Sequence, residues 1–167
     1  IRVMMSFSGF VKKVFGINIG KKLFGKMLLS KLSLDTNRIC ISGGGPLPAS
    51  TFKKFNQLGI DFVQGYGLTE TSPITHLNPV DAYEETSVGK LLPGLEQKIV
   101  DADEEGNGVL YVRGSVVMKG YYNNPEATAE VLDSEGWLNT GDVGHIDDRG
   151  YFYITGRRKS VIVTEGG

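Results

Sequence analysis

Residues 38–64 of the chain read RICISGGGPLPASTFKKFNQLGIDFVQ, and this stretch predicts an α/β unit. Arg38–Ser42 is a short apolar run typical of a buried strand, and a run of glycines follows it. Ala49 to Leu58 has its apolar side chains at helical spacing, and Asp61–Gln64 is typical of a second short strand. We therefore expect a strand–loop–helix–strand unit whose two strands pair in parallel.

Upstream of this unit, residues 1–37 show helical periodicity and a strong basic character. The apolar positions at helical spacing are Met4, Phe7, Val11, Val14 and Phe15, followed by Leu23, Phe24, Met27, Leu28 and Leu32. Residues 1–38 carry eight Lys and Arg and one acid, Asp35, whereas the whole chain has a net charge of −1. Such a stretch is usually the solvated face of packed helices, and peripheral contact with a membrane is the alternative. The overall charge gives no indication of nucleic-acid binding.

The pattern changes to short apolar segments bounded by glycine from about Thr86 onward. The positions that indicate strands are Val88, Leu110, Val112, Val116 and Met118, followed by the alternating Tyr151, Tyr153, Val161 and Val163. Pro125 to Leu132 predicts a brief helix with Asn124 as its cap. The predicted fold class is thus α/β plus β. Residues 1–80 would form the α/β subdomain and residues 81–167 a β-rich subdomain, a small distorted barrel, with the junction near residues 76–86.

Several simple site types are excluded by spacing. Cys40 is the one cysteine, so neither a disulfide nor a zinc set can form within the chain, which fits a reducing, cytoplasmic setting. The segment 101–106 resembles a calcium loop, but its twelfth position is Val112, where a bidentate Glu is needed. His76 and His145 have no partner at metal-ligand spacing. The glycines at 43–45 lack the Gly-Lys-Ser/Thr ending of a phosphate loop.

The informative feature is an ordered series of motifs between residue 42 and residue 159. It runs SGGGPLP (42–48), QGYGLTETSP (64–73), VRG (112–114), GYYNNP (120–125), GWLNTGD (136–142) and GYFYITGRRK (150–159). In this order and spacing the chain resembles the adenylate-forming superfamily, which includes acyl-CoA synthetases, luciferases of the firefly type and peptide-synthetase adenylation domains. The resemblance covers about three quarters of the chain, and it is closest to the members that activate fatty acids.

The resemblance implies a reaction and a nucleotide site. Such enzymes join a carboxylate to the α-phosphate of ATP, release pyrophosphate and pass the acyl group to a thiol such as CoA. Tyr66, between Gly65 and Gly67, matches the aromatic residue that stacks on adenine, and its flanking glycines let the backbone approach a flat ring. Asp142 matches the carboxylate that holds the ribose hydroxyls, and Arg157 a basic group near ribose and phosphate.

The remaining matched positions concern phosphate, metal and substrate. Thr69 matches a hydroxyl that contacts phosphate, and Glu70 matches the Mg²⁺ ligand. Gly43, Gly44 and Gly45 match a loop that lines the adenine and acyl pockets. Lys159 matches the hinge to a small C-terminal domain. Each residue also has a plainer interpretation: a turn tyrosine, a solvated acid at a helix start, a turn aspartate, a surface arginine, or glycines that only make turns.

The expected phosphate loop and the small domain with its catalytic lysine have no counterpart in these residues. With Ile1 at one end and Gly167 at the other, we expect a piece of a longer enzyme that is inactive alone. We also expect an open sheet edge and exposed apolar faces. For the complete protein we expect a fatty-acyl-CoA ligase that uses ATP, Mg²⁺ and CoA. An enzyme for aryl or amino acids and a non-catalytic nucleotide-binding fragment are the alternatives. The sequence does not indicate the oligomeric state.

Overall fold

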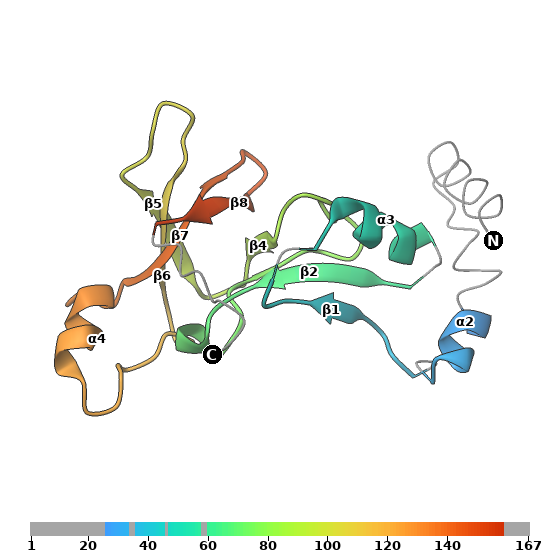
Figure 1. The fold of residues 1–167 in the computed structure, drawn as a ribbon, viewed down its shortest axis with the longest axis horizontal. Helices are drawn as coiled ribbons and strands as arrows, with labels where there is room; N and C mark the ends of the chain where they lie inside the picture. The colour runs from blue at the N-terminus through green and yellow to red at the C-terminus, as the bar shows by residue number, and fades with distance from the viewer. Residues whose placement is uncertain (1–25, 34–35, 46, 58–59, 159–167) are drawn as a thin grey trace, which may run out of the picture.

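The computed structural model describes residues 26–33, 36–45, 47–57 and 60–158. Within them lie α2 (Lys26–Lys31), β1 (Cys40–Ser42), α3 (Ala49–Gln57), β2 (Phe62–Tyr66), the short 3₁₀ helix η2 (Thr69–Thr71), β3 (His76–Leu77), β4 (Gly89–Leu91), β5 (Glu96–Val100), β6 (Gly108–Arg113), α4 (Pro125–Val131), β7 (Leu138–Ile146) and β8 (Tyr151–Arg157). The β-rich part and the β1–α3–β2 unit lie side by side along the long axis of the molecule (Figure 1). Their strands join in one sheet of order β1-β2-β3-β4-β8-β7-β6-β5 among the described residues.

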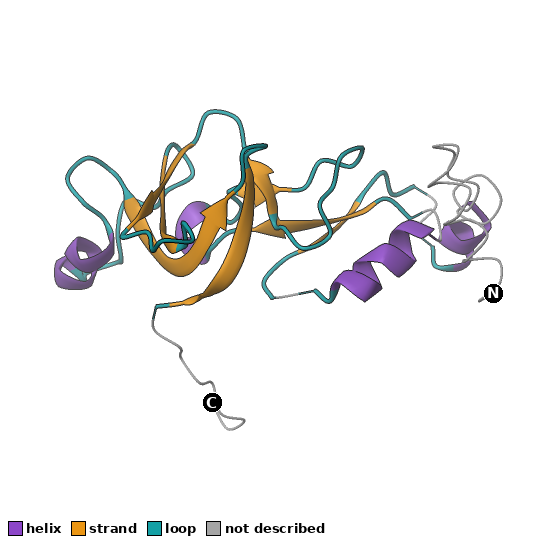
Figure 2. Ribbon diagram, turned by 90° about the horizontal axis from the view of Figure 1, so that it is seen from above, coloured by secondary structure: helices purple, strands orange, loops and turns teal. Residues whose placement is uncertain are grey.

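The α/β unit forms as the sequence predicts. β1 pairs with β2 in parallel, with Cys40 opposite Phe62. Helix α3 packs on this pair, and Figure 2 shows it running along one face of the two strands. Phe52, a residue of this helix, is fully buried. The Asn56 side-chain amide donates to the Phe62 carbonyl at 3.0 Å, which ties the helix to the strand. The helix is described to Gln57, and Leu58 lies outside the described residues.

β1 is shorter and less buried than predicted. It begins at Cys40 rather than Arg38, Cys40 is half-buried, and Ile41 is 51% exposed. Side chains alternate between the two faces of a strand, so α3 can cover only one set of them. β1 also pairs with β2 alone among the described residues. The sheet therefore has the open edge and exposed apolar side chain that we expected.

β2 is longer than predicted, because it continues through Gly65 to Tyr66 instead of ending at Gln64. Gly65 and Tyr66 pair with Leu77 and His76 of β3, so the motif that begins at residue 64 starts on a strand. All later neighbours in the sheet are antiparallel. The predicted α/β plus β fold is confirmed. The predicted junction near residues 76–86 does not interrupt the sheet, because β3 pairs with β4.

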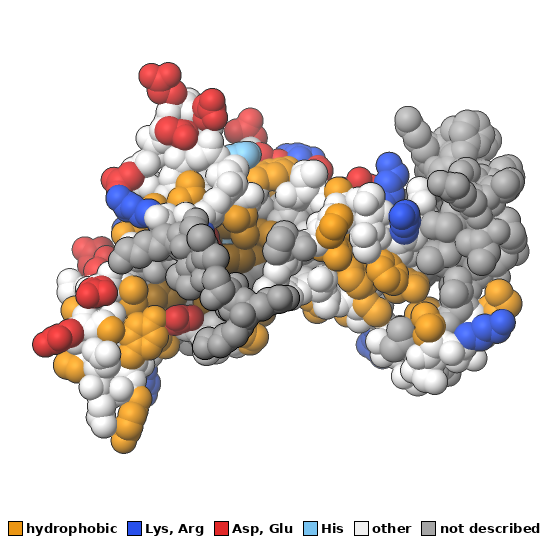
Figure 3. Space-filling view, viewed as in Figure 1, with side chains coloured by type: hydrophobic (Ala, Val, Ile, Leu, Met, Phe, Trp, Pro, Cys, Tyr) orange, Lys and Arg blue, Asp and Glu red, His pale blue; other side chains and the backbone are white. Residues whose placement is uncertain are grey.

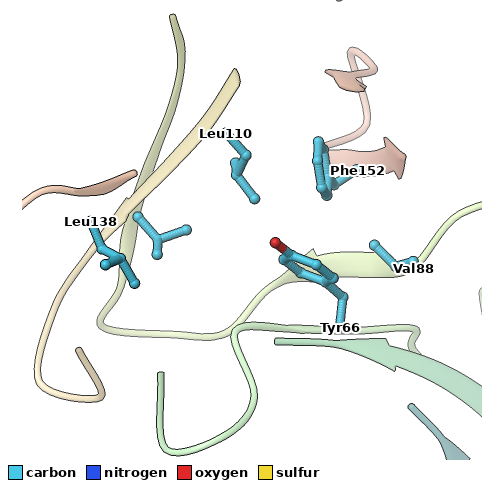
Figure 4. Close-up of a cluster of buried hydrophobic side chains, with 6 residues drawn as sticks. Tyr66, Val88, Leu110, Leu138 and Phe152 are labelled. Atoms are coloured by element: carbon cyan, nitrogen blue, oxygen red, sulfur yellow. The ribbon is translucent and has the colours of Figure 1, made fainter. Parts of the chain in front are cut away.

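The β-rich part is a curled open sheet rather than a closed barrel within the described residues, since β5 at its end pairs only with β6. Register shifts interrupt the β6–β7 pairing between Val109 and Tyr111, and the β7–β8 pairing between Val143 and Gly144. Irregularities of this kind bend strands and increase their twist. The core inside the curl consists of Tyr66, Val88, Leu110, Val112, Leu138 and Phe152 (Figure 4).

Three positions predicted as strand lie outside the strands. Val88 precedes β4, whereas Val116 lies in the turn after β6 and Met118 follows that turn. β6 ends because Gly114 adopts a φ of +145°, and the Val117 amide then donates to the Gly114 carbonyl at 3.1 Å in a tight turn. Apolar character alone is therefore not sufficient to predict that these positions lie in strands.

The predicted capped helix is confirmed as α4, although it ends at Val131 rather than Leu132. The Asn124 side chain accepts the Ala127 amide at 3.0 Å, and Pro125 occupies the first turn. Of the predicted N-terminal helices, α2 falls on the second periodic segment, with Met27 52% exposed, and the first lies outside the described residues. Val161 and Val163 also lie outside them. No helix of the described part has the length and apolar character needed to cross a bilayer.

Candidate functional site

A cavity of about 710 Å³ lies where the α/β unit meets the β-rich part. It is lined from both sides by residues 44, 45, 47, 49, 64–68, 85, 86, 88, 142, 154, 156 and 157. The cavity brings together Gly44, Gly45, Tyr66, Asp142 and Arg157, with the glycines that flank Tyr66. These positions come from β1, β2, β7 and β8 or the loops that follow them, so both parts of the sheet contribute to one cavity.

Tyr66 ends β2 and points into the core of the β-rich part (Figure 4). Its ring is 9% exposed and packs edge-on against Phe152, with ring centroids 5.7 Å apart. The phenol donates to Asp142 Oδ2 at 2.5 Å. Burial raises the pKa of Tyr66, and the hydrogen bond to Asp142 raises it further, so the phenol stays protonated as a donor. Tyr66 is thus packed into the core as well as lining the cavity, and its stacking on adenine stays a prediction.

Asp142 lies on β7 next to the irregular pairing at residue 143 and is buried, with its side chain 12% exposed. Arg157 is its register partner on β8, and Arg157 Nε lies 3.5 Å from Asp142 Oδ1. One carboxylate oxygen therefore meets the phenol and the other meets the guanidinium. A carboxylate has about four lone-pair sites, so each oxygen can still accept a further hydrogen bond from a diol.

The glycines of the two predicted loops differ in what they do. Gly44 and Gly45 are exposed and line the cavity, whereas Gly43 is absent from its lining. A Cβ on Gly67 would overlap the backbone of Pro73, and one on Gly65 would lie 2.9 Å from the Ile74 side chain. Gly67 is therefore required for close packing of two chain segments, a reason that the sequence did not reveal, whereas a side chain at Gly65 would require Ile74 to shift.

A second cavity of about 780 Å³ adjoins the first and shares Leu68 and Arg157 with it. Glu70 lies in its wall, together with residues 68, 121, 130, 131, 138–141, 157 and 158. Glu70 Oε1 accepts the Tyr121 hydroxyl at 2.8 Å. This hydrogen bond is the largest cause of a raised pKa for Tyr121.

The backbone around Glu70 is fixed by a neighbouring threonine. Thr71 is fully buried, accepts the Leu68 amide at 2.9 Å and donates to the Leu68 carbonyl at 3.0 Å. Thr69 on the same turn is exposed and is absent from the lining of both cavities. Its phosphate-contact role stays a prediction, as does the hinge role of Lys159, which lies outside the described residues.

A magnesium ion fits the second cavity only as a partner of the nucleotide. Mg²⁺ usually binds one or two carboxylates together with phosphate oxygens and water. Glu70 supplies one such carboxylate, and the described residues contain no cluster of three or more acids, His or Cys that could hold a metal by themselves. Arg157 and Arg158 line the same space and can attract phosphate.

The acidic segment 101–106, which resembles a calcium loop in sequence, forms a turn between β5 and β6. Asp103 Oδ1 accepts the Glu105 amide at 3.0 Å and the Asn107 amide at 2.8 Å. Figure 3 shows acidic side chains gathered at this turn, far from the β1–α3–β2 unit. The Asp103 carboxylate therefore has a structural use in the turn itself.

Two contributors to the site were missed from sequence. Tyr121 belongs to the motif 120–125, which was noted but received no role, and Thr71 belongs to the motif 64–73. The position of Thr71 one residue after the predicted metal ligand was a usable signal, because short polar residues often bond to nearby backbone. Nothing local connects Tyr121 with Glu70, which lies 51 residues away.

Comparisons with known proteins identify a family for the chain. The model of the family described as AMP-binding enzyme matches residues 4–122. A long-chain-fatty-acid–CoA ligase from Xenopus laevis is 38% identical over 150 residues, which is 90% of this chain and 20% of that protein. The chain spans about a fifth of the length of such curated relatives.

Solved structures give the same result. ATP-bound MatB from Rhodopseudomonas palustris is 33% identical with a TM-score of 0.68, over 88% of this chain and 31% of that one. The anthranilate CoA ligase AuaEII, in complex with anthranoyl-AMP, is 30% identical with a TM-score of 0.65, over 74% of this chain and 25% of that one. Because the family model covers more than half of the chain, the chain belongs to the family of AMP-binding enzymes.

Proposed function

We propose that the complete protein that contains these residues is an acid–thiol ligase. It would convert a carboxylic acid and ATP into an acyl-adenylate and pyrophosphate, and then transfer the acyl group to CoA. A fatty acid of medium or long chain is the proposed acid, and the cytoplasm the proposed location. One observation carries the proposal: the cavity lined by Tyr66, Asp142 and Arg157 adjoins the cavity that holds Glu70.

The roles follow from position and chemistry. Asp142 would accept the ribose hydroxyls while its hydrogen bond to Tyr66 fixes its orientation. Arg157 lies between the two cavities and would contact the phosphate chain where the nucleotide passes from one to the other. Glu70 would bind Mg²⁺, which neutralises negative charge on the departing pyrophosphate. Gly44 and Gly45 would leave room for the nucleotide base and the acyl chain.

The experiment that tests this proposal is an acid-dependent assay of the complete protein. It is incubated with ATP, Mg²⁺, CoA and one member of a panel of fatty acids, aryl acids and amino acids, and both AMP and acyl-CoA are quantified. We expect equal amounts of AMP and fatty-acyl-CoA, with strong loss in Asp142→Asn. If no acid in the panel causes AMP release, the proposal is wrong. A dominant aryl acid would replace the fatty acid but leave the reaction class intact.

For the 167-residue chain alone we propose no turnover. Adenylation requires several groups to surround the triphosphate at once, and most of the length of the relatives lies outside the matched region. The same assay measures this point: steady AMP production by the isolated chain would contradict it. Weak binding of AMP by the isolated chain, measured by calorimetry, is compatible with the proposed roles of Asp142 and Arg157.

A further inference from the structure

The motif GYYNNP at residues 120–125 has received no role so far, yet it touches the candidate metal ligand. The Tyr121 hydroxyl donates to Glu70 Oε1 at 2.8 Å. The next residue, Tyr122, is 93% exposed and is absent from the lining of the cavity that contains Glu70. Of the two adjacent tyrosines, only the first therefore contacts the site.

Helix α4 fixes the position of Tyr121. The Tyr121 amide donates to Thr128 Oγ1 at 2.9 Å. The Thr128 hydroxyl donates in turn to the Asn124 carbonyl at 2.8 Å. The preceding Gly120 has a φ of +147°, and a Cβ there would lie 2.8 Å from Thr128 Cγ2. This backbone conformation suits glycine and brings the segment close to the helix. The backbone position of Tyr121 is therefore fixed by its contacts with α4.

The same segment also holds the backbone of Glu70. The Met118 amide donates to the Glu70 carbonyl at 2.8 Å. Residues 118–121 consequently contact both ends of Glu70, its carbonyl and one carboxylate oxygen. On the other side, buried Thr71 fixes the turn that carries Glu70. A glutamate has several side-chain torsions, and these contacts restrict them before a ligand arrives.

We propose that Tyr121 is a positioning residue that orients Glu70 toward the divalent cation accompanying the nucleotide. The inference rests on the proposed function and adds a residue to it. With Oε1 held by the phenol, Oε2 is the oxygen for which the described residues provide no assigned partner. Carboxylates that ligate metals are commonly oriented in this way by a hydrogen bond from a neighbour, and loss of such a partner weakens metal binding.

A purely structural role for Tyr121 is less consistent with its surroundings. Its side chain is 39% exposed, and α4 has no buried residue. Little apolar surface is therefore lost from the core when the hydroxyl is removed or the ring is altered. The hydrogen bond to Glu70 is the specific contact that the hydroxyl makes.

The decisive experiment compares Tyr121→Phe with Tyr122→Phe in the complete protein. Binding of Mn²⁺ is followed by electron paramagnetic resonance in the presence of ATP and without the acid, so that no turnover occurs. We expect Tyr121→Phe to weaken cation binding about tenfold and Tyr122→Phe to leave it unchanged. In the acid-dependent assay, Tyr121→Phe should raise the Mg²⁺ concentration for half-maximal rate by a similar factor. Thr128→Val, which removes the tether of Tyr121, should shift both quantities in the same direction but less.

A double-mutant cycle identifies the route of the effect. In a Glu70→Gln background, Tyr121→Phe should cause no further loss of cation binding, because the carboxylate that Tyr121 orients is already absent. Equal Mn²⁺ binding by Tyr121→Phe and Tyr122→Phe, in a protein that still binds ATP and makes AMP, overturns this inference alone. An intact protein that neither binds ATP nor makes AMP overturns the proposed function, and the inference with it.

Discussion

Two tyrosine–carboxylate pairs of the described residues line the candidate cavities, and they differ in depth. Tyr66 donates to Asp142 at 2.5 Å with both side chains buried, whereas Tyr121 donates to Glu70 at 2.8 Å in an exposed setting. Each tyrosine follows a glycine, and each carboxylate lines a cavity. The pair at Tyr66 is built into the core of the fold, and the pair at Tyr121 is attached to its surface.

The difference in burial predicts different effects on stability when a hydrogen bond of each pair is lost. A hydrogen bond inside the core is shielded from water, so the loss of either partner leaves a buried polar group without its bond. At the surface, water replaces a lost partner and the fold changes little. We therefore expect changes at Tyr66 to affect both stability and nucleotide binding, and changes at Tyr121 to affect cation binding alone.

The largest effect should come from removing the ring at each position. Tyr66→Ala empties space between Phe152 and His76, and large-to-small changes of aromatic residues in cores cost about 3–5 kcal/mol of unfolding free energy. Tyr121→Ala should cost less than about 1 kcal/mol, because its side chain is 39% exposed. Urea unfolding followed by circular dichroism measures both values. Similar losses in the two variants would break the contrast.

Acid should weaken the buried region through His76. This side chain is fully buried against Tyr66, and burial lowers its pKa from 6.5 to about 4, despite an opposing hydrogen bond to Gln97. The folded pKa lies below the unfolded value, so the stability contribution is complete above about pH 6.5. It is lost as the pH falls toward 4, because the unfolded chain takes up the proton first.

Between pH 7 and pH 5 this linkage amounts to about 2 kcal/mol of unfolding free energy. Carboxylates also titrate in acid, so the relevant quantity is the difference in pH dependence between the wild type and His76→Gln. We expect the wild type to lose more stability than the variant over this interval. Parallel pH profiles for the two proteins would show that His76 is not the titrating group.

The fold was predictable where its signals are local. Helix α3 and its two flanking strands follow from periodicity, and Asn124 and Pro125 mark the start of α4 by cap chemistry. Val116 and Met118 were misjudged because Gly114 turns the chain after β6, and apolar character does not report a positive φ. The cleft itself was predictable only from the order of the motifs, which the family resemblance made interpretable.

The contacts inside the site were not predictable in the same way. Tyr66 and Asp142 are 76 residues apart, and the interaction of the phenol with the carboxylate depends on how β2 and β7 meet. The irregular pairing beside Asp142 is a property of two strands together, which one sequence segment does not reveal. Pairing of distant side chains is therefore the part of the site that required three-dimensional coordinates.

The smallest and most specific test removes one oxygen from each tyrosine. Tyr66→Phe keeps the ring but leaves the buried Asp142 carboxylate without its donor, which should cost about 1.5 kcal/mol of unfolding free energy. Tyr121→Phe should cost less than about 0.5 kcal/mol, since water can take the place of its hydroxyl at Glu70. Thermal unfolding with a chemical-denaturation cross-check resolves a difference of this size. If Tyr121→Phe destabilises the fold as much as Tyr66→Phe, the outer pair is structural, and the distinction between a pair that stabilises the fold and a pair that acts in binding alone is wrong.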